Sequence, residues 1–167
     1  VRRVPYRLPE LLQADRTAPV FVVEGEKDVE TLRHLGLTAT CNSGGASKWR
    51  EEYSRHFAGL HVVVIPDNDE PGREHARRVA GSLRSVAASV KLLELPGLTE
   101  KGEDVSDWLA AGHAIQELTA LADGASMYSG ETAYSTDQAG APRKFWFSDT
   151  GAFYPAPIRT RRGHKHP

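Results

Sequence analysis

The chain has 167 residues, of which 40% are hydrophobic and 26% are charged, and its formal net charge is −1. This composition is typical of one globular domain with an appendage, and no apolar run approaches the roughly 20 residues that a membrane-spanning helix needs. A charge so near zero excludes a domain that grips nucleic acid by overall charge alone. A single cysteine, Cys41, excludes an internal disulfide or a cysteine-built zinc site, so a reducing, cytoplasmic setting is expected. Because the chain starts at Val1 rather than at a Met, we expect it to be a segment of a longer polypeptide.

The pattern of elements begins with a lead-in segment, residues 1–17, which is extended at first and then forms a short helical turn at Leu8–Leu12. Beyond it, apolar runs rich in β-branched residues alternate with stretches of helical periodicity. The predicted strands are Val20–Val23, Leu37–Cys41, Val62–Ile65 and Val90–Leu95. The predicted helices are Glu26–Leu35, Ala46–Phe57, Pro71–Leu83, Asp104–Ala111 and Ile115–Leu121.

Strands that are apolar throughout and separated by helices are typical of parallel βαβ units with both sheet faces covered. The sequence therefore predicts an α/β domain at residues 18–122, a Rossmann-like open parallel sheet of about four strands sandwiched by helices. Residues 123–167 form a polar and aromatic C-terminal extension, expected to be partly disordered or a hairpin, with short strands near Phe145–Phe147 and Phe153–Tyr154. Those aromatic side chains either pack against the domain or stack on bases or a partner protein.

Acidic side chains follow three of the four predicted strands. Glu24 comes directly after the first strand, and Asp67 and Asp69 come after the third. Asp104 follows the loop after the fourth strand. Because the carboxyl ends of parallel strands share one edge of the sheet, we expect these carboxylates to converge there. Clusters of carboxylate oxygens suit Mg²⁺ or Mn²⁺, hard cations that favour phosphate-bearing substrates.

Each acidic residue also has a purely structural interpretation. Asp67 and Asp69 could cap the helix that begins near Pro71, and Asp104 could cap the next one. Glu24 alone could be a solvated residue at a strand end. The convergence of all of them at equivalent topological positions favours the metal site.

Basic and amide side chains near the same edge are candidates for phosphate contacts. The loop Asn42–Lys48 contains Gly44 and precedes a predicted helix, so it is either an anion cradle or a tight turn that needs glycine. Lys27, Lys48 and Arg73 lie just past strand ends. The chain contains no P-loop, no G-x-S-x-G elbow and no H-E-x-x-H motif, which argues against NTPase activity, a serine triad and a catalytic histidine.

Two motifs together resemble the Toprim domain, which bacterial-type primases, topoisomerases, recombination-mediator proteins and OLD-family nucleases share. The first is "VVEGEKDVETL", with Glu24 at a strand end, and the second is "IPDNDEPGREHARR", with Asp67 and Asp69 after a later strand. The residues after Asp69, and the later "GEDVSDWL", look most like the primase branch of phage- and plasmid-type primase–helicases. The likeness covers residues 18–122.

The resemblance implies metal-dependent phosphoryl or nucleotidyl transfer on nucleic acid with Mg²⁺ or Mn²⁺. By position, Glu24 would be a general base or metal-shell residue, with Asp67 and Asp69 as catalytic metal ligands and Asp104 and Asp107 at a second cation. The residues that would contact substrate or phosphate are Lys27, Asn42, Gly44, Lys48 and Arg73. Primases of this kind join NTPs into an RNA primer on single-stranded DNA, and the full-length protein would carry zinc-binding and helicase modules. A Toprim nuclease and a non-catalytic nucleic-acid-binding module are the alternatives that the motifs leave open.

Overall fold

The computed structural model describes residues 3–42 and 48–130, together with the backbone of four short strands between residues 135 and 155. The chain forms two compact units, Val1–Gly130 and Glu131–Pro167. None of the helices in the described ranges has the length and apolar character that crossing a bilayer requires.

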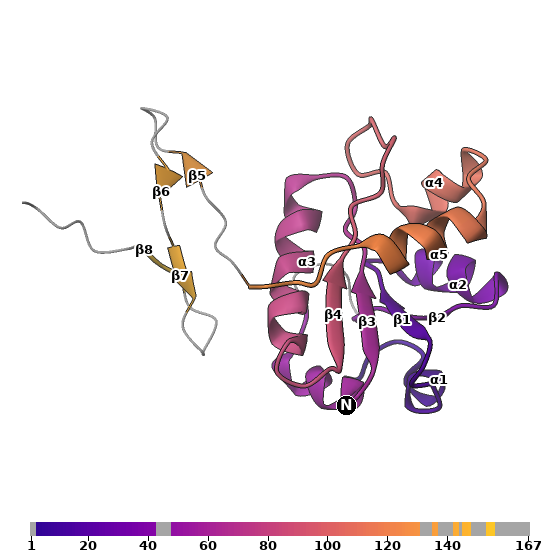
Figure 1. Cartoon of the computed structure of the whole chain (residues 1–167), viewed down its shortest axis with the longest axis horizontal. Helices are drawn as coiled ribbons and strands as arrows, with labels where there is room; N and C mark the ends of the chain where they lie inside the picture. Colours follow the sequence, from indigo (N-terminus) through magenta and orange to yellow (C-terminus); the bar gives the residue numbers. More distant parts are fainter. Residues whose placement is uncertain are drawn as a thin grey trace, which may run out of the picture. The chain divides into compact units, whose positions relative to one another are not determined.

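The first unit alternates strands and helices in the predicted order (Figure 1). Its elements are α1 (Leu8–Leu12), β1 (Pro19–Val22), α2 (Glu26–His34), β2 (Thr38–Thr40), the 3₁₀ helix η1 (Glu51–Phe57), β3 (His61–Val64), α3 (Glu70–Leu83), β4 (Ser89–Leu92), α4 (Val105–Ala110) and α5 (Ile115–Gly124). Every strand and helix predicted for this part of the chain is present, although most bounds shift by a few residues and one helix is of another type.

The four strands form one parallel sheet in the order β2-β1-β3-β4, which confirms the predicted α/β class. The chain runs from β1 outward to β2 and then returns to place β3 on the other side of β1. The gap between β1 and β3 is therefore the point at which the strand order reverses. In open α/β sheets, ligands bind beyond the carboxyl ends of the strands at this point.

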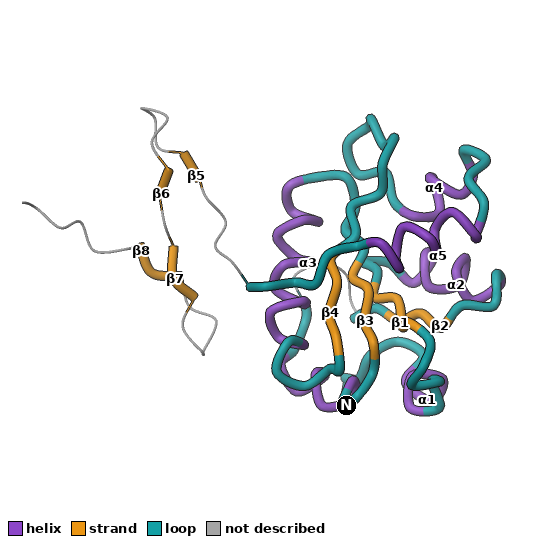
Figure 2. Tube along the Cα trace, in the orientation of Figure 1, coloured by secondary structure: helices purple, strands orange, loops and turns teal. Residues whose placement is uncertain are grey.

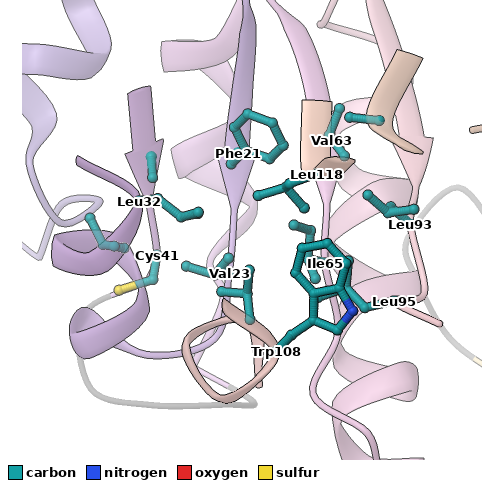
Figure 3. Close-up of a cluster of buried hydrophobic side chains, with 14 residues drawn as sticks. Phe21, Val23, Leu32, Cys41, Val63, Ile65, Leu93, Leu95, Trp108 and Leu118 are labelled. Atoms are coloured by element: carbon teal, nitrogen blue, oxygen red, sulfur yellow. The ribbon is translucent and has the colours of Figure 1, made fainter. Parts of the chain in front are cut away.

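The strand residues alternate between two hydrophobic clusters, as successive side chains on a strand must. Phe21, Val63 and Ile65 face a cluster that includes Leu32 of α2, Trp108 of α4 and Leu118 of α5 (Figure 3). Val20, Val22, Val62 and Val64 face the other cluster, which includes Val79 and Leu83 of α3. Burial on both faces explains why these strands read as continuous apolar runs.

The helix expected at Ala46–Phe57 is the one element whose type differs. Residues 43–47 lie outside the described part of the chain, and Glu51–Phe57 forms a 3₁₀ helix. Arg50 before it is extended, with φ −117° and ψ 134°. Trp49 is thereby turned towards α3, where its Nε1 donates to Ser82 Oγ at 3.1 Å and its ring packs on Tyr53 and Phe57. The segment therefore packs Trp49 against α3 and does not form the continuous α-helix that its periodicity predicted.

Short segments of the same unit run along both outer strands of the sheet. Beside β2, Pro5 forms an antiparallel bridge with Asn42, and Tyr6 N donates to Cys41 O at 2.8 Å. Beside β4, Met127 bridges Lys91, and Tyr128 N donates to Val90 O at 2.8 Å. The unit therefore includes residues on both sides of the 18–122 range.

In the second unit, β7 (Phe145–Phe147) pairs antiparallel with β8 (Phe153–Pro155), as expected for two aromatic strands. Two further short strands, β5 (Ser135–Thr136) and β6 (Pro142–Arg143), also pair antiparallel. The turn at 148–151 and the basic tail at 156–167 lie outside the described residues.

Candidate functional site

The site lies where β1 and β3 end side by side. These strands pair in register, with Val22 opposite Val64, so the residues that follow them reach the same rim. Glu24 follows β1 and Asp67 follows β3. A small pocket opens between the two strand ends, and Glu24, Pro66, Gly72 and His75 contribute to its lining.

The start of α3 holds Asp67 and Asp69 at this rim. Asp69 is the N-cap of the helix, and its Oδ1 accepts a hydrogen bond from Gly72 N at 2.7 Å. Asp69 therefore caps α3, as the structural interpretation of this residue predicted. The cap uses only one of its two carboxylate oxygens. A Cβ placed on Gly72 would lie 2.8 Å from the Asp67 carbonyl oxygen, so only glycine permits this turn.

The carboxyl groups of Glu24 and Asp67 resist ionisation together. Burial raises the pKa of Glu24, the charges of Asp69 and Asp28 raise it further, and a hydrogen bond from Asp67 offsets part of the shift. Burial, followed by the charge of Glu24, raises the pKa of Asp67 to about 7. In addition, Glu24 Oε2 is buried and has no hydrogen-bond partner among the residues that the structure describes. Glu24, Asp67 and Asp69 therefore form one repelling cluster, which we call the acidic rim.

Asp28 is a fourth carboxylate near the rim that sequence reasoning did not single out. It lies in the first turn of α2, is only 3% exposed, and accepts a hydrogen bond from Ser106 Oγ at 2.5 Å. Burial raises its pKa, although the Ser106 bond opposes the shift. An acid in a first helical turn looks like ordinary dipole compensation. The available signal was its spacing of four residues from Leu32, which places it on the buried face of α2.

Asp104 lies beside this group, with its charge acting on both Asp28 and Asp67. It is also the N-cap of α4, in a capping box that uses the Asp107 side chain. Lys27 Nζ donates to Asp104 Oδ2 at 2.6 Å. Burial would raise the pKa of Asp104, but the hydrogen bonds from Lys27 and from the Asp107 backbone hold it below its usual range. Asp104 is therefore ionised. The carboxylate of Asp107 accepts a hydrogen bond from the backbone N–H of Asp104.

The other residues predicted to contact substrate or phosphate differ in how far they are buried. Arg73, in the first turns of α3, donates to Asn68 Oδ1 at 3.3 Å and pairs with Glu70. Asn42 is 1% exposed at the end of β2, and Lys48 is exposed before η1. Gly44 lies outside the described residues.

His75 is a second residue that the sequence did not single out. It is 6% exposed on the inner side of α3 and lines the pocket beneath the rim. Burial, and then the nearby Arg78, lowers the pKa of His75 to about 4, so the ring is neutral at physiological pH. No histidine motif accompanies it in the sequence, so only the fold brings it to the pocket.

The donor set of the rim fits a hard divalent cation. Its oxygens come from carboxylates, and one of these oxygens, Glu24 Oε2, is buried and has no hydrogen-bond partner within the described part of the chain. The mutual repulsion of the carboxylates is the kind that a bound cation relieves. Within residues 3–42 and 48–130, no three His, Cys, Asp or Glu side chains already enclose a metal position. The residues that would hold a cation therefore share a rim and do not form a closed ligand set.

Most of this unit matches a known protein family. Residues 21–109 match the sequence profile of the family described as Toprim-like. The gene 57 protein of Mycobacterium phage D29 is 33% identical over 86 residues, which cover 51% of this chain and 51% of the phage protein. The chain thus matches about half the length of this curated relative.

Solved primase structures share the fold. A DNA primase domain from Pseudomonas aeruginosa has 27% sequence identity and a TM-score of 0.57, over 74% of this chain and 39% of that one. A DnaG catalytic core has 23% identity and a TM-score of 0.58, over 74% and 40%. A DnaG primase catalytic domain bound to single-stranded DNA has 21% identity and a TM-score of 0.56, over 74% and 40%.

Proposed function

Because the chain belongs to the Toprim-like family, we propose that its acidic rim binds Mg²⁺ or Mn²⁺ and catalyses nucleotidyl transfer in the synthesis of RNA primers on single-stranded DNA. The observation that carries the proposal is the gathering of Glu24, Asp67 and Asp69 at the point where the strand order reverses. The likeness to a DNA primase domain at 27% identity supports the primase branch.

Each carboxylate has a role that matches its surroundings. Glu24 combines partial burial with a raised pKa, which suits a group that accepts and holds a proton near the reacting oxygen. Asp67 and Asp69 would be the main cation ligands. Asp104, which is ionised, would help to hold a second cation, with Asp107 supporting it through the capping box. When bound, the cations would neutralise charge on the transferred phosphate.

The substrates in this proposal are NTPs and a single-stranded DNA template. The phosphate groups would contact residues around the rim that offer cationic side chains, a side-chain amide or, at Gly44, the backbone. These residues are Lys27, Asn42, Gly44, Lys48 and Arg73. Because bound cations offset the acidic rim, a nearly neutral chain can still hold polyanions. Zinc-binding and helicase modules would accompany this unit in a longer protein.

The test is incubation of the protein with single-stranded DNA, labelled NTPs and Mn²⁺. New short RNA is expected, and Glu24→Gln should reduce it by about 100-fold or more while the variant remains folded. Glu51→Gln, which changes an exposed acid on η1, serves as the matched control. Shortened DNA instead of new RNA would indicate a Toprim nuclease. Nucleic-acid binding without turnover and without Mn²⁺ dependence would indicate a non-catalytic module.

A further inference from the structure

The residue between the two rim aspartates, Asn68, joins two loops at the carboxyl ends of the strands. Its backbone N donates to Glu103 O at 2.8 Å, and its backbone O accepts from Gly102 N at 3.2 Å. Its side-chain Nδ2 donates to Glu100 O at 2.9 Å. These three hydrogen bonds, which we call the loop clamp, connect the loop after β3 to the loop that leads from β4 to α4 (Figure 2).

The partner loop is itself held in one shape. Glu103 Oε2 accepts hydrogen bonds from the backbone N atoms of Thr99 and Glu100, both at 2.7 Å. Gly102 has φ +80°, and a Cβ there would lie 4.0 Å from Asp69 Oδ2. The loop therefore passes directly beside Asp69, and the residue after Glu103 is Asp104. The loop clamp thus connects the backbone that carries Asp67 and Asp69 to the backbone that carries Asp104.

The side chain of Asn68 is chemically suited to two tasks at once. While Nδ2 donates to the partner loop, Oδ1 accepts from Arg73 Nη1 at 3.3 Å. Among small side chains, an amide supplies a donor and an acceptor together, whereas aspartate supplies acceptors only and alanine neither.

We propose that Asn68 is a positioning residue, which sets the spacing between the Asp67/Asp69 pair and Asp104 so that the two sets of carboxylates act on the same group of cations. This inference rests on the proposed function. Asn68 acts here through the loop clamp and needs no contact with the cations or substrate. The two loops follow different strands, β3 and β4. Strand pairing fixes the ends of these strands, but it does not fix the distance between the loops that carry the carboxylates, and the clamp does.

The test is Mn²⁺ affinity, measured by calorimetry, in two variants of the full chain. Asn68→Ala removes the side-chain part of the loop clamp and should weaken Mn²⁺ binding by about 10-fold or more, the size typical for groups that orient metal ligands. Thr99→Ala should bind as the wild type does, because Thr99 contributes its backbone N–H to the loop.

Hydrogen exchange gives a readout that does not depend on cations. The Gly102 amide should exchange faster in Asn68→Ala than in wild type or Thr99→Ala, while the thermal unfolding midpoint stays nearly unchanged. Unchanged Mn²⁺ affinity in Asn68→Ala, or an equal loss in Thr99→Ala, overturns the inference while wild-type binding stands. A wild-type protein that binds no Mn²⁺ overturns the proposed function and this inference with it.

Discussion

Gly72 packs so closely on Asp67 that a Cβ on Gly72 would lie 2.8 Å from the carbonyl oxygen and 3.1 Å from the Cβ of Asp67. The same glycine donates its N–H to Asp69. A single residue thus fixes the backbone of one rim aspartate and caps the helix through the other. The acidic rim depends on a close approach of α3 to the end of β3, and the charges alone do not create it.

Replacing Gly72 with Ala should therefore damage both the fold and the rim. We expect a loss of about 1–3 kcal/mol in the free energy of unfolding, because the methyl group overlaps backbone that cannot move aside cheaply. Mn²⁺ affinity should fall as well. The matched control is Gly81→Ala on the same helix, where nothing lies within 4 Å and alanine should stabilise by about 0.5–1 kcal/mol. Denaturant unfolding of both variants checks this, and equal effects would contradict it.

The contribution of Asp67 to the stability of the cation-free protein should fall as pH rises. The pKa of Asp67 is about 7 in the folded protein, above its usual value of 3.8. The folded state therefore holds a proton that the unfolded state has lost, and the stability associated with that proton disappears between about pH 4 and pH 7. Because the carboxyl is partly solvated, we expect about 1–2 kcal/mol over this range. Unfolding of wild type and Asp67→Asn in EDTA at several pH values measures it, because wild type should lose stability relative to Asp67→Asn as pH rises. Equal slopes would assign the effect to another group.

Two substitutions at Asp69 separate its capping role from its proposed role in cation binding. Asp69→Asn keeps an oxygen for the Gly72 N–H, so stability should change little, whereas Asp69→Ala should cost about 1 kcal/mol. Both variants should lose Mn²⁺ affinity, since both remove the charged ligand. Combined unfolding and calorimetric titration decides the question. A folded Asp69→Asn that binds Mn²⁺ normally would leave Asp69 as a helix cap only.

Ser106 should stabilise the buried carboxylate of Asp28. Its hydroxyl lies 2.5 Å from Asp28 Oδ1 and 2.9 Å from Thr31 Oγ1, so it links α4 to α2. Ser106→Ala should cost about 1–3 kcal/mol in the free energy of unfolding, because it leaves a buried acceptor without its donor. In an Asp28→Asn background the cost should be smaller, which a double-mutant cycle would reveal. Ser85→Ala, at an exposed position, is the control.

Most of the fold could be predicted because local signals and burial agree. The runs Val20–Val23 and Val62–Ile65 are apolar on both faces, and both faces of the sheet are indeed covered. The convergence of Glu24, Asp67 and Asp69 was also predictable, since parallel strands place their carboxyl ends at one edge. These features follow from periodicity and topology, which a single sequence carries.

Other features depend on contacts between distant loops and helices. Asp28 becomes a buried member of the site only when α4 brings Ser106 against α2. Asn68 acquires its partners only when the loop around Glu103 folds beside it. The 3₁₀ geometry of Glu51–Phe57 similarly reflects how Trp49 docks on α3. No periodicity in the sequence records these long-range contacts.

The bridges from Pro5 to Asn42 and from Lys91 to Met127 have a consequence for the molecule's solubility. The outer strands of an open sheet normally present unpaired N–H and C=O groups, which can recruit strands from neighbouring molecules and start aggregation. Here the chain's own flanking segments occupy part of both margins. A unit protected in this way can be carried within a larger polypeptide while offering little backbone for intermolecular strand addition.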